Sequence, residues 1–310
     1  MIGVRRPHVA RSLVLGVSAG VAISILAWPT GAAADDEVSA GETVVGELVQ
    51  VWPEYEDLED TAEHADDGPL SYLRTDSGEA VRLDSDDVEE IAAGSIVEVT
   101  VGREITDTAS AEAGFAEARN VLEAEVLEAS PEPPAQTAPA ALPYTNSVTV
   151  AMVAPAGGSR DSTTVDKVVT AVNGPVADFW DEQTDGRIRI GVTASHDWIS
   201  TTAGCSDPYA LWTEVARKVG FTRGAGKHLL LYVTGTPSNL AGCSYGLAEV
   251  GSAPSVGGYS YVRDVHTPLV AHELGHNFGL GHSSAAQCFQ PGYSGGCWTY
   301  AYRDFYDVMG

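Results

Sequence analysis

Basic residues are scarce in this chain of 310 residues. It has 17 Lys and Arg against 43 Asp and Glu, so its formal net charge at pH 7 is -26. A surface this negative repels phosphate, which argues against nucleic acid as a partner. Hydrophobic residues make up 44% of the chain, and its length allows two domains, so a sizeable core is expected.

Long apolar runs are also lacking, apart from one near the N-terminus. This run covers residues 13–28, follows three arginines and precedes three alanines at 32–34. It is shorter than the roughly 20 residues that span a bilayer. The pattern predicts a signal peptide at 1–34, and hence a secreted, extracellular protein with no membrane contact after cleavage. An uncleaved membrane anchor is the alternative.

Cysteine is rare, and none precedes Cys205. The four are Cys205, Cys243, Cys288 and Cys297, and no C-x-x-C spacing occurs among them. In an exported chain they are expected to form disulfides, for which three pairings are possible. We favour Cys205 with Cys243 and Cys288 with Cys297. Metal ligation by cysteine is the weaker alternative.

The acidity is concentrated in one segment. Residues 35–132 carry a net charge of -25 out of the total of -26. Within 35–129 we predict a small, β-rich N-terminal domain, with strands at 43–52, 70–76, 79–84 and 95–102. Residues 109–129 read as an exposed acidic helix, and the Pro- and Ala-rich stretch at 130–143 reads as a linker.

A cluster of aspartates in this domain raises the question of calcium. Asp84, Asp86 and Asp87 lie close together, but the glycine of an EF-hand loop is missing, so Ca²⁺ is possible and unsupported. Asp86 to Glu89 resembles a capping box, which predicts a short helix after it. We favour the interpretation that these aspartates cap this helix and face the solvent.

From residue 144 onward, predicted strands and helices alternate. Strands are expected at 146–155, 186–195, 227–236, 245–251 and 257–265, and helices at 162–184 and 207–221. Thr267 as N-cap and Pro268 as first residue mark the start of a further helix. The order predicts an α/β (α+β) domain with a mixed, largely parallel sheet and helices packed on it.

The third helix carries the sequence HELGHNFGLGH at 272–282. His272 and His276 are four residues apart, so both imidazoles lie on one face of a helix and converge on one point. Gly279 permits the left-handed turn that ends the helix. The chain can then return His282 as a third ligand. Three histidines leave one position of a zinc ion open for water, whereas structural zinc sites usually have four protein ligands.

This H-E-x-x-H-x-x-G-x-x-H pattern resembles the consensus of the metzincin clan of zinc metallopeptidases. The resemblance implies one catalytic Zn²⁺ held by His272, His276 and His282, with Glu273 as general base. It also implies a methionine in a tight turn beneath the metal, which Met309 in the C-terminal sequence DVMG fits. Metzincins continue with a helix after this Met-turn, so we expect the domain at 144–310 to be C-terminally truncated.

The resemblance extends to regulation and substrate binding. In secreted peptidases of this clan an N-terminal segment is usually a propeptide, so the resemblance implies that residues 35–129 are a propeptide that inhibits the enzyme. Without a cysteine before Cys205, any latency must use another donor, such as a carboxylate of the acidic segment. Residues 245–251 are the candidate for the edge strand that binds extended peptide substrates; an internal strand is the equal alternative.

The resulting hypothesis is a secreted zinc metalloendopeptidase, similar to gametolysin-like or reprolysin-like bacterial members, that acts on protein or peptide substrates. The alternatives are a zinc-binding adhesion protein without turnover and an N-terminal domain that binds a target. Three further histidines, His196, His228 and His266, are expected to be structural, although His266 could lie near the metal. For Asp307 we favour a role in stabilising the turn.

Overall fold

A computed structural model describes residues 40–55, 68–130, 145–288, 297–301, 304 and 306–310. The predicted signal peptide, and all of the predicted linker except Ser130, lie outside these residues. Among the described residues, no helix is long and apolar enough to cross a membrane.

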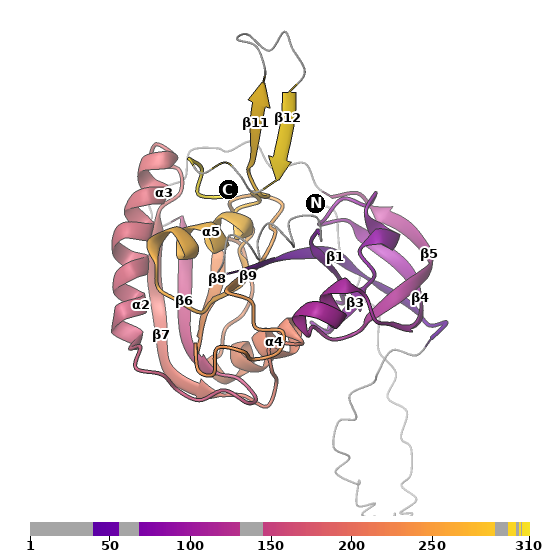
Figure 1. Ribbon diagram of the computed structural model, residues 1–310, viewed down its shortest axis with the longest axis horizontal. Coiled ribbons are helices and arrows are strands. Elements are labelled where there is room, and N and C mark those ends of the chain that lie inside the picture. Colours follow the sequence, from indigo (N-terminus) through magenta and orange to yellow (C-terminus); the bar gives the residue numbers. More distant parts are fainter. Residues whose placement is uncertain (1–39, 56–67, 131–144, 289–296, 302–303, 305) are drawn as a thin grey trace, which may run out of the picture. The chain divides into compact units, whose positions relative to one another are not determined.

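The N-terminal domain, which we define as the described residues of 40–130, is a small closed sheet. Its strands are β1 (Thr43–Glu54), β2 (Leu70–Arg74), β3 (Ala80–Leu83), β4 (Ile96–Ile105) and β5 (Ala118–Glu128). The strand order is β2-β3-β5-β4-β1, and a further β1–β2 pairing closes the ring into a five-stranded barrel (Figure 1). Alternating residues of β1 and β4, among them Leu48, Val97 and Val99, fill its interior and are fully buried.

Two predictions for this domain are wrong. The predicted helix at 109–129 is instead the single π-helical turn η2 (Ala109–Ala113) followed by strand β5. The sequence of β5 is rich in helix-forming residues, but its pairing with β4 along nearly its whole length overrides that propensity. The predicted capping box is the 3-10 turn η1 (Asp86–Val88), which has Ser85 at its N-cap position and no side-chain cap.

The C-terminal domain, residues 145–310, is built on a mixed sheet. Strands β6 (Asn146–Ala154), β7 (Ile190–Ser200), β8 (Lys227–Val233) and β10 (Gly258–Val262) run parallel to one another, and β9 (Gly246–Glu249) is antiparallel to β10. The order is β9-β10-β8-β6-β7. The N-terminal strand β1 pairs with β9, so one ten-stranded sheet runs through both domains.

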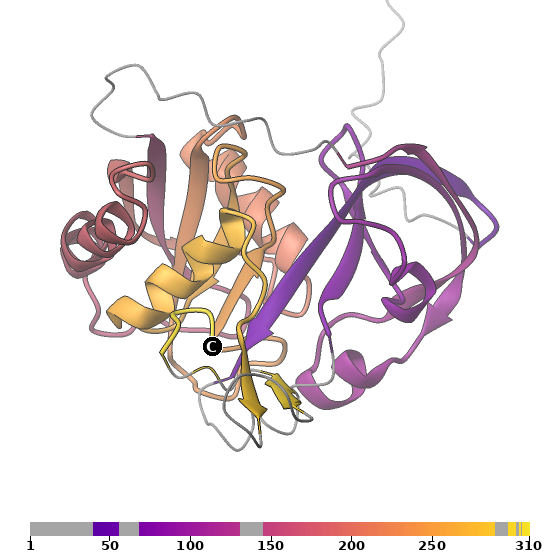
Figure 2. The ribbon, with the colours of Figure 1, turned by 90° about the horizontal axis from the view of Figure 1, so that it is seen from above.

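Helices cover both faces of this sheet (Figure 2). Helix α4 (Pro208–Val219) packs Tyr209, Leu211 and Trp212 on one face, against β8 residues such as Leu229 and Leu231. The other face, which includes Leu230 of β8, is covered by α2 (Val165–Ala171), the π-helical turn η3 (Val172–Val176), α3 (Ala177–Gln183) and α5 (Thr267–Asn277). Side chains of a strand alternate between its faces, so one strand serves both cores.

Helix α4 begins at the predicted N-cap, whereas α5 begins one residue earlier than predicted. Asp207 caps α4 by accepting a hydrogen bond from the Ala210 N–H at 2.9 Å, with Pro208 in the first turn. Helix α5 has His266 at its N-cap position, without a side-chain cap, so Thr267 is its first residue rather than its cap. The short strands β11 (Ser284–Cys288) and β12 (Cys297–Ala301) form a separate two-stranded sheet (Figure 1).

A fully buried histidine links the sheet to α5. The two ring nitrogens of His228 lie 3.1 Å from Asn277 Oδ1 and 2.9 Å from Asn146 Oδ1. Burial lowers the pKa of His228 to about 4. The imidazole is therefore neutral in the folded protein at pH values where an unfolded histidine already binds a proton.

We predict an acid-dependent loss of stability through His228. Between the unfolded pKa of 6.5 and the folded pKa of about 4 the unfolded chain binds more protons, so stability falls as the pH falls through this window. The full loss is about 3 kcal/mol. Denaturant unfolding at pH 7 and pH 4.5 should show a smaller acid loss in His228→Gln than in the wild type. The control His266→Gln, at a side chain that is 71% exposed, should lose as much as the wild type.

Candidate metal centre

Helix α5 presents two histidines from one face. His272 and His276 are both buried, and their ring centroids lie 4.7 Å apart. The helix ends at Asn277, and Gly279 has a φ of +95°. A Cβ atom on Gly279 would lie 2.9 Å from the Gly251 carbonyl oxygen, so both the backbone conformation and the close approach favour glycine here.

The turn at Gly279 brings His282 back to the helix. The ring centroid of His282 lies 4.7 Å from that of His276 and 5.2 Å from that of His272. The Nε2 atoms of His276 and His282 are 3.0 Å apart. The structure therefore places the three predicted metal ligands together.

Backbone carbonyls fix how two of these rings carry their protons. His272 Nδ1 lies 2.7 Å from the Val308 carbonyl oxygen, and His276 Nδ1 lies 2.8 Å from that of Leu280. A carbonyl only accepts, so each Nδ1 donates and each neutral ring keeps its lone pair on Nε2. Second-shell hydrogen bonds of this kind orient metal-binding histidines.

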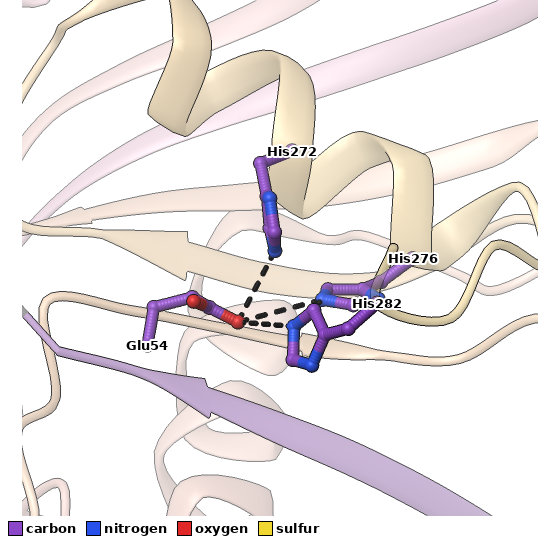
Figure 3. A group of neighbouring side chains, drawn as sticks. All are labelled: Glu54, His272, His276 and His282. Carbon is purple, nitrogen blue, oxygen red and sulfur yellow. Dashed lines mark hydrogen bonds and ion pairs between the residues drawn. The ribbon is translucent and has the colours of Figure 1, made fainter. Parts of the chain in front are cut away.

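A fourth group, from the N-terminal domain, occupies the point where the rings converge. Glu54 is the last residue of β1, and its Oε1 atom lies 2.5 Å from His282 Nε2, 3.1 Å from His272 Nε2 and 3.6 Å from His276 Nε2 (Figure 3). Burial alone would raise the pKa of Glu54, but hydrogen bonds donated by protonated imidazoles outweigh it and hold this pKa well below its usual range. The carboxylate is therefore ionised.

The residues present fit a metal ion. One ligand atom from each of Glu54, His272, His276 and His282 lies within 4.8 Å of the others. Imidazole nitrogen and carboxylate oxygen are ligands that zinc accepts, and four is its usual number. Lone pairs aimed at one point are mutually repulsive unless a cation or a proton lies between them. The group is thus compatible with zinc, and its donor types alone do not define the metal.

Glu273 lies beside this cluster and is not part of it. Its side chain is fully buried, and neither carboxylate oxygen has a hydrogen-bond partner within the described part of the chain. Burial raises the pKa of Glu273 well above its usual range, and the negative charge of Glu54 adds to the effect. A buried carboxyl without a partner requires explanation, because an unsatisfied polar group of this kind destabilises a fold.

The backbone of β9 makes room for this carboxyl. A Cβ atom on Gly246 would lie 1.9 Å from Glu273 Oε1, so any side chain at this position would displace the carboxylate. Gly246 thus sets the position of Glu273, and the sequence pattern does not reveal this role because a glycine inside a strand has several explanations.

Met309 packs beneath α5. It is 3% exposed, and its sulfur lies 2.5 Å from where a Cβ atom on Gly275 would be. The Met309 N–H donates to Asp307 Oδ1 at 2.8 Å, so Asp307 stabilises the turn, as favoured from the sequence. The Met309 carbonyl accepts from the Ser283 N–H at 2.7 Å, which ties the turn to the residue after His282.

The remaining candidate residues lie outside the cluster. The structure has disulfides between Cys205 and Cys243 and between Cys288 and Cys297, the pairing favoured above. The cluster excludes His196, His228 and His266. The sequence does not single out Glu54 as an individual residue. The one signal for such a residue was the lack of cysteine in the acidic segment, which indicated that a carboxylate would have to serve as the donor for latency.

We predict that the chain binds one zinc ion and that His276→Ala lowers its affinity for zinc by at least about 100-fold. Loss of a residue that hydrogen-bonds to a metal ligand costs about 10- to 100-fold in affinity, and loss of the ligand itself should cost more. Metal content after dialysis, together with competition against a chromogenic chelator, measures this. His196→Ala, a histidine outside the cluster, is the control. Equal zinc binding by His276→Ala and the wild type would contradict the assignment.

Comparison with known proteins gives distant structural likenesses and no match to a family. No family model and no curated protein matches the chain. Among solved structures, a metalloproteinase-II from Bacteroides fragilis is similar, with 11% sequence identity and a TM-score of 0.28, over 69% of this chain and 67% of that one. A TM-score this low does not establish a common fold, and the His and Glu group described above carries the assignment of a candidate zinc site.

Proposed function

We propose that this chain is a secreted zinc endopeptidase of metzincin type, made in a form that is latent while the N-terminal domain is in place. The observation that carries the proposal is the pairing of two features. Three histidines converge, two of them with Nε2 oriented by backbone carbonyls, and the adjacent Glu273 carboxyl is buried without a hydrogen-bond partner in the described structure. A site that only stored zinc would have no chemical use for such a carboxyl.

The chemistry divides between the metal and the protein. When bound, zinc would lower the pKa of its water and polarise the carbonyl of the peptide bond. His272, His276 and His282 would hold it, and the carbonyls of Val308 and Leu280 set the ring orientations of the first two. Glu273 would accept the proton of the attacking water and return it to the leaving amine.

The position of the Glu54 carboxylate supports latency. Its Oε1 atom contacts all three histidines, so it occupies the position that water would need. Trp52, two residues earlier on β1, packs against His282 with 4.5 Å between ring centroids and covers the same ring. A carboxylate ligand would thus take the place of the cysteine of a thiol switch, as the lack of cysteine before Cys205 requires.

Strand β9 is the proposed binding edge for substrate. β1 pairs with it through Val51, Trp52, Pro53 and Glu54, antiparallel and next to the histidines. An extended substrate peptide would use the same backbone groups once β1 has left.

Two disulfides are consistent with an extracellular protein, and the predicted signal peptide supports secretion.

We predict that replacing Glu54 activates the full-length chain. Glu54→Ala should raise the rate of cleavage of short fluorogenic peptides at least about tenfold over the wild type, because the carboxylate no longer fills the site and its contacts with the histidines no longer hold the end of β1 on β9. This expectation corresponds to a change of about 1.4 kcal/mol in the population of the open site. Glu98→Ala, a carboxylate on β4 of the same domain, is the matched control and should leave the latent state unchanged. A wild type as active as Glu54→Ala would contradict latency.

The test of the peptidase itself uses Glu273. In the Glu54→Ala background, Glu273→Gln should lower kcat by about 10²- to 10⁴-fold, the usual contribution of a general base, while zinc content stays the same. A chelator should abolish cleavage by Glu54→Ala. If Glu54→Ala binds one zinc ion but cleaves neither peptides nor an unfolded protein, the chain is a zinc-binding protein without turnover.

A further inference from the structure

We infer that the N-terminal domain remains bound to the C-terminal domain after the chain between them is cut, so that cleavage of the linker alone does not free the metal centre. The inferred interaction surface lies on the C-terminal domain and consists of the β9 edge, the aromatic face of α4, and Glu249. Its partner is the N-terminal domain of the same chain. The consequence for activation depends on the proposed function, whereas the binding itself does not.

The first observation is backbone pairing. β9 and β1 pair antiparallel over four residues, from Gly246 opposite Glu54 to Glu249 opposite Val51. Beyond this register, the Val250 N–H donates to the Gln50 carbonyl at 2.8 Å and the Tyr245 N–H donates to the Glu54 carbonyl at 2.7 Å. Among the described strands of the C-terminal domain β9 has β10 alone as a neighbour, so without β1 it is an edge strand.

The second observation is a hydrophobic core that belongs to both domains. One cluster of buried side chains contains Val51 and Tyr72 of the N-terminal domain together with Tyr209, Trp212 and Leu247 of the C-terminal domain. The rings of Tyr72 and Tyr209 contact each other, with 4.7 Å between centroids. Separation would expose apolar surface on both partners, and burial of such surface is the main driving force of association.

The third observation is a buried charge network that crosses the same boundary. Glu249 of β9 has a side chain only 3% exposed, and it pairs with Arg223 at 2.8 Å and with Arg74 of the N-terminal domain at 3.0 Å. Tyr209 donates to the same carboxylate at 2.7 Å. Dissociation would leave Glu249 with one guanidinium instead of two, and an uncompensated buried charge is costly.

None of these contacts involves the predicted linker. A covalent connection between two bound partners contributes effective concentration and no contact of its own. Cutting it therefore leaves the pairing, the shared core and the charge network in place, with Glu54 still among the histidines. Release requires unfolding or destruction of the N-terminal domain itself.

The experiment introduces the recognition sequence of a site-specific protease within 131–143 of the full-length chain. The Glu273→Gln variant is used so that no self-cleavage occurs. After complete cutting, size-exclusion chromatography and native mass spectrometry at low micromolar concentration should find both fragments in one 1:1 complex. Two separately eluting fragments, with the C-terminal fragment folded by circular dichroism, would overturn the inference.

Hydrogen exchange provides a second measurement on the same material. The amides of Tyr245 and Val250 donate to β1 carbonyls, so they should remain protected after cutting, to the same degree as before. Loss of protection at these two amides, with protection kept in β8, would show that β1 has left and would also overturn the inference. This readout does not depend on zinc or on turnover.

A variant tests the charge network. Arg74→Met keeps the length of the side chain and removes its charge, and in the cut protein it should speed dissociation of the fragments at least about tenfold, since loss of one partner of a buried pair acts mainly on the dissociation rate. Arg119→Met is the matched control, because Arg119 forms its ion pair with Glu104 inside the N-terminal domain. Equal dissociation rates for both variants would show that the ion pair of Arg74 with Glu249 does not stabilise the complex.

The cut Glu54→Ala protein, with Glu273 intact, separates the failure of this inference from that of the proposed function. Fragments that stay together and cleave peptides in a chelator-sensitive way support both. Fragments that separate but cleave overturn the inference and leave the function standing. Fragments that stay together and never cleave, although zinc is bound, support the binding. The function is overturned if cleavage is still absent after the N-terminal fragment has been removed by denaturation and the C-terminal fragment refolded with zinc.

Discussion

The pairing of β1 with β9 is the interaction on which the rest of the structure depends. It joins a closed N-terminal sheet to the sheet of the C-terminal domain and makes β1 a member of both. The same pairing fixes the register of β1, and register decides which side chains face which surface, since a shift by one residue would turn Glu54 away from the histidines. The metal centre as described is therefore a product of two distant segments of the chain.

The C-terminal domain supplies the other half of the centre through two constraints on α5. One is the turn at Gly279, which returns His282 to the helix. The other is the chain end, where the Val308 carbonyl orients His272 and Met309 fills the space next to Gly275. These contacts set the ring directions before any metal arrives, and such preorganisation is what a metal site on a rigid helix requires.

Much of the local structure followed from the sequence, for reasons that can be named. The spacing of His272, His276 and His282 encodes a helix face and a turn. Strand β8 has an uninterrupted apolar run and β6 a largely apolar one, which short-range patterns detect. The helix-forming residues of β5 led to the wrong prediction of a helix. Its pairing with β4 is a tertiary interaction, which local propensities do not reveal. The contact of Glu54 with the histidines could not be predicted for a similar reason, because Glu54 and His282 are 228 residues apart in the chain.

The role of β1 in two sheets has a consequence for the C-terminal domain on its own. An uncovered strand edge presents free N–H and C=O groups to any extended chain, including another copy of itself. β9 is short and fully buried here, with Leu247 and Ala248 at 0% exposure, so its edge would be both apolar and hydrogen-bond competent once bare. The N-terminal domain thus keeps an adhesive surface covered, and the C-terminal domain without it would be most prone to self-association at this edge.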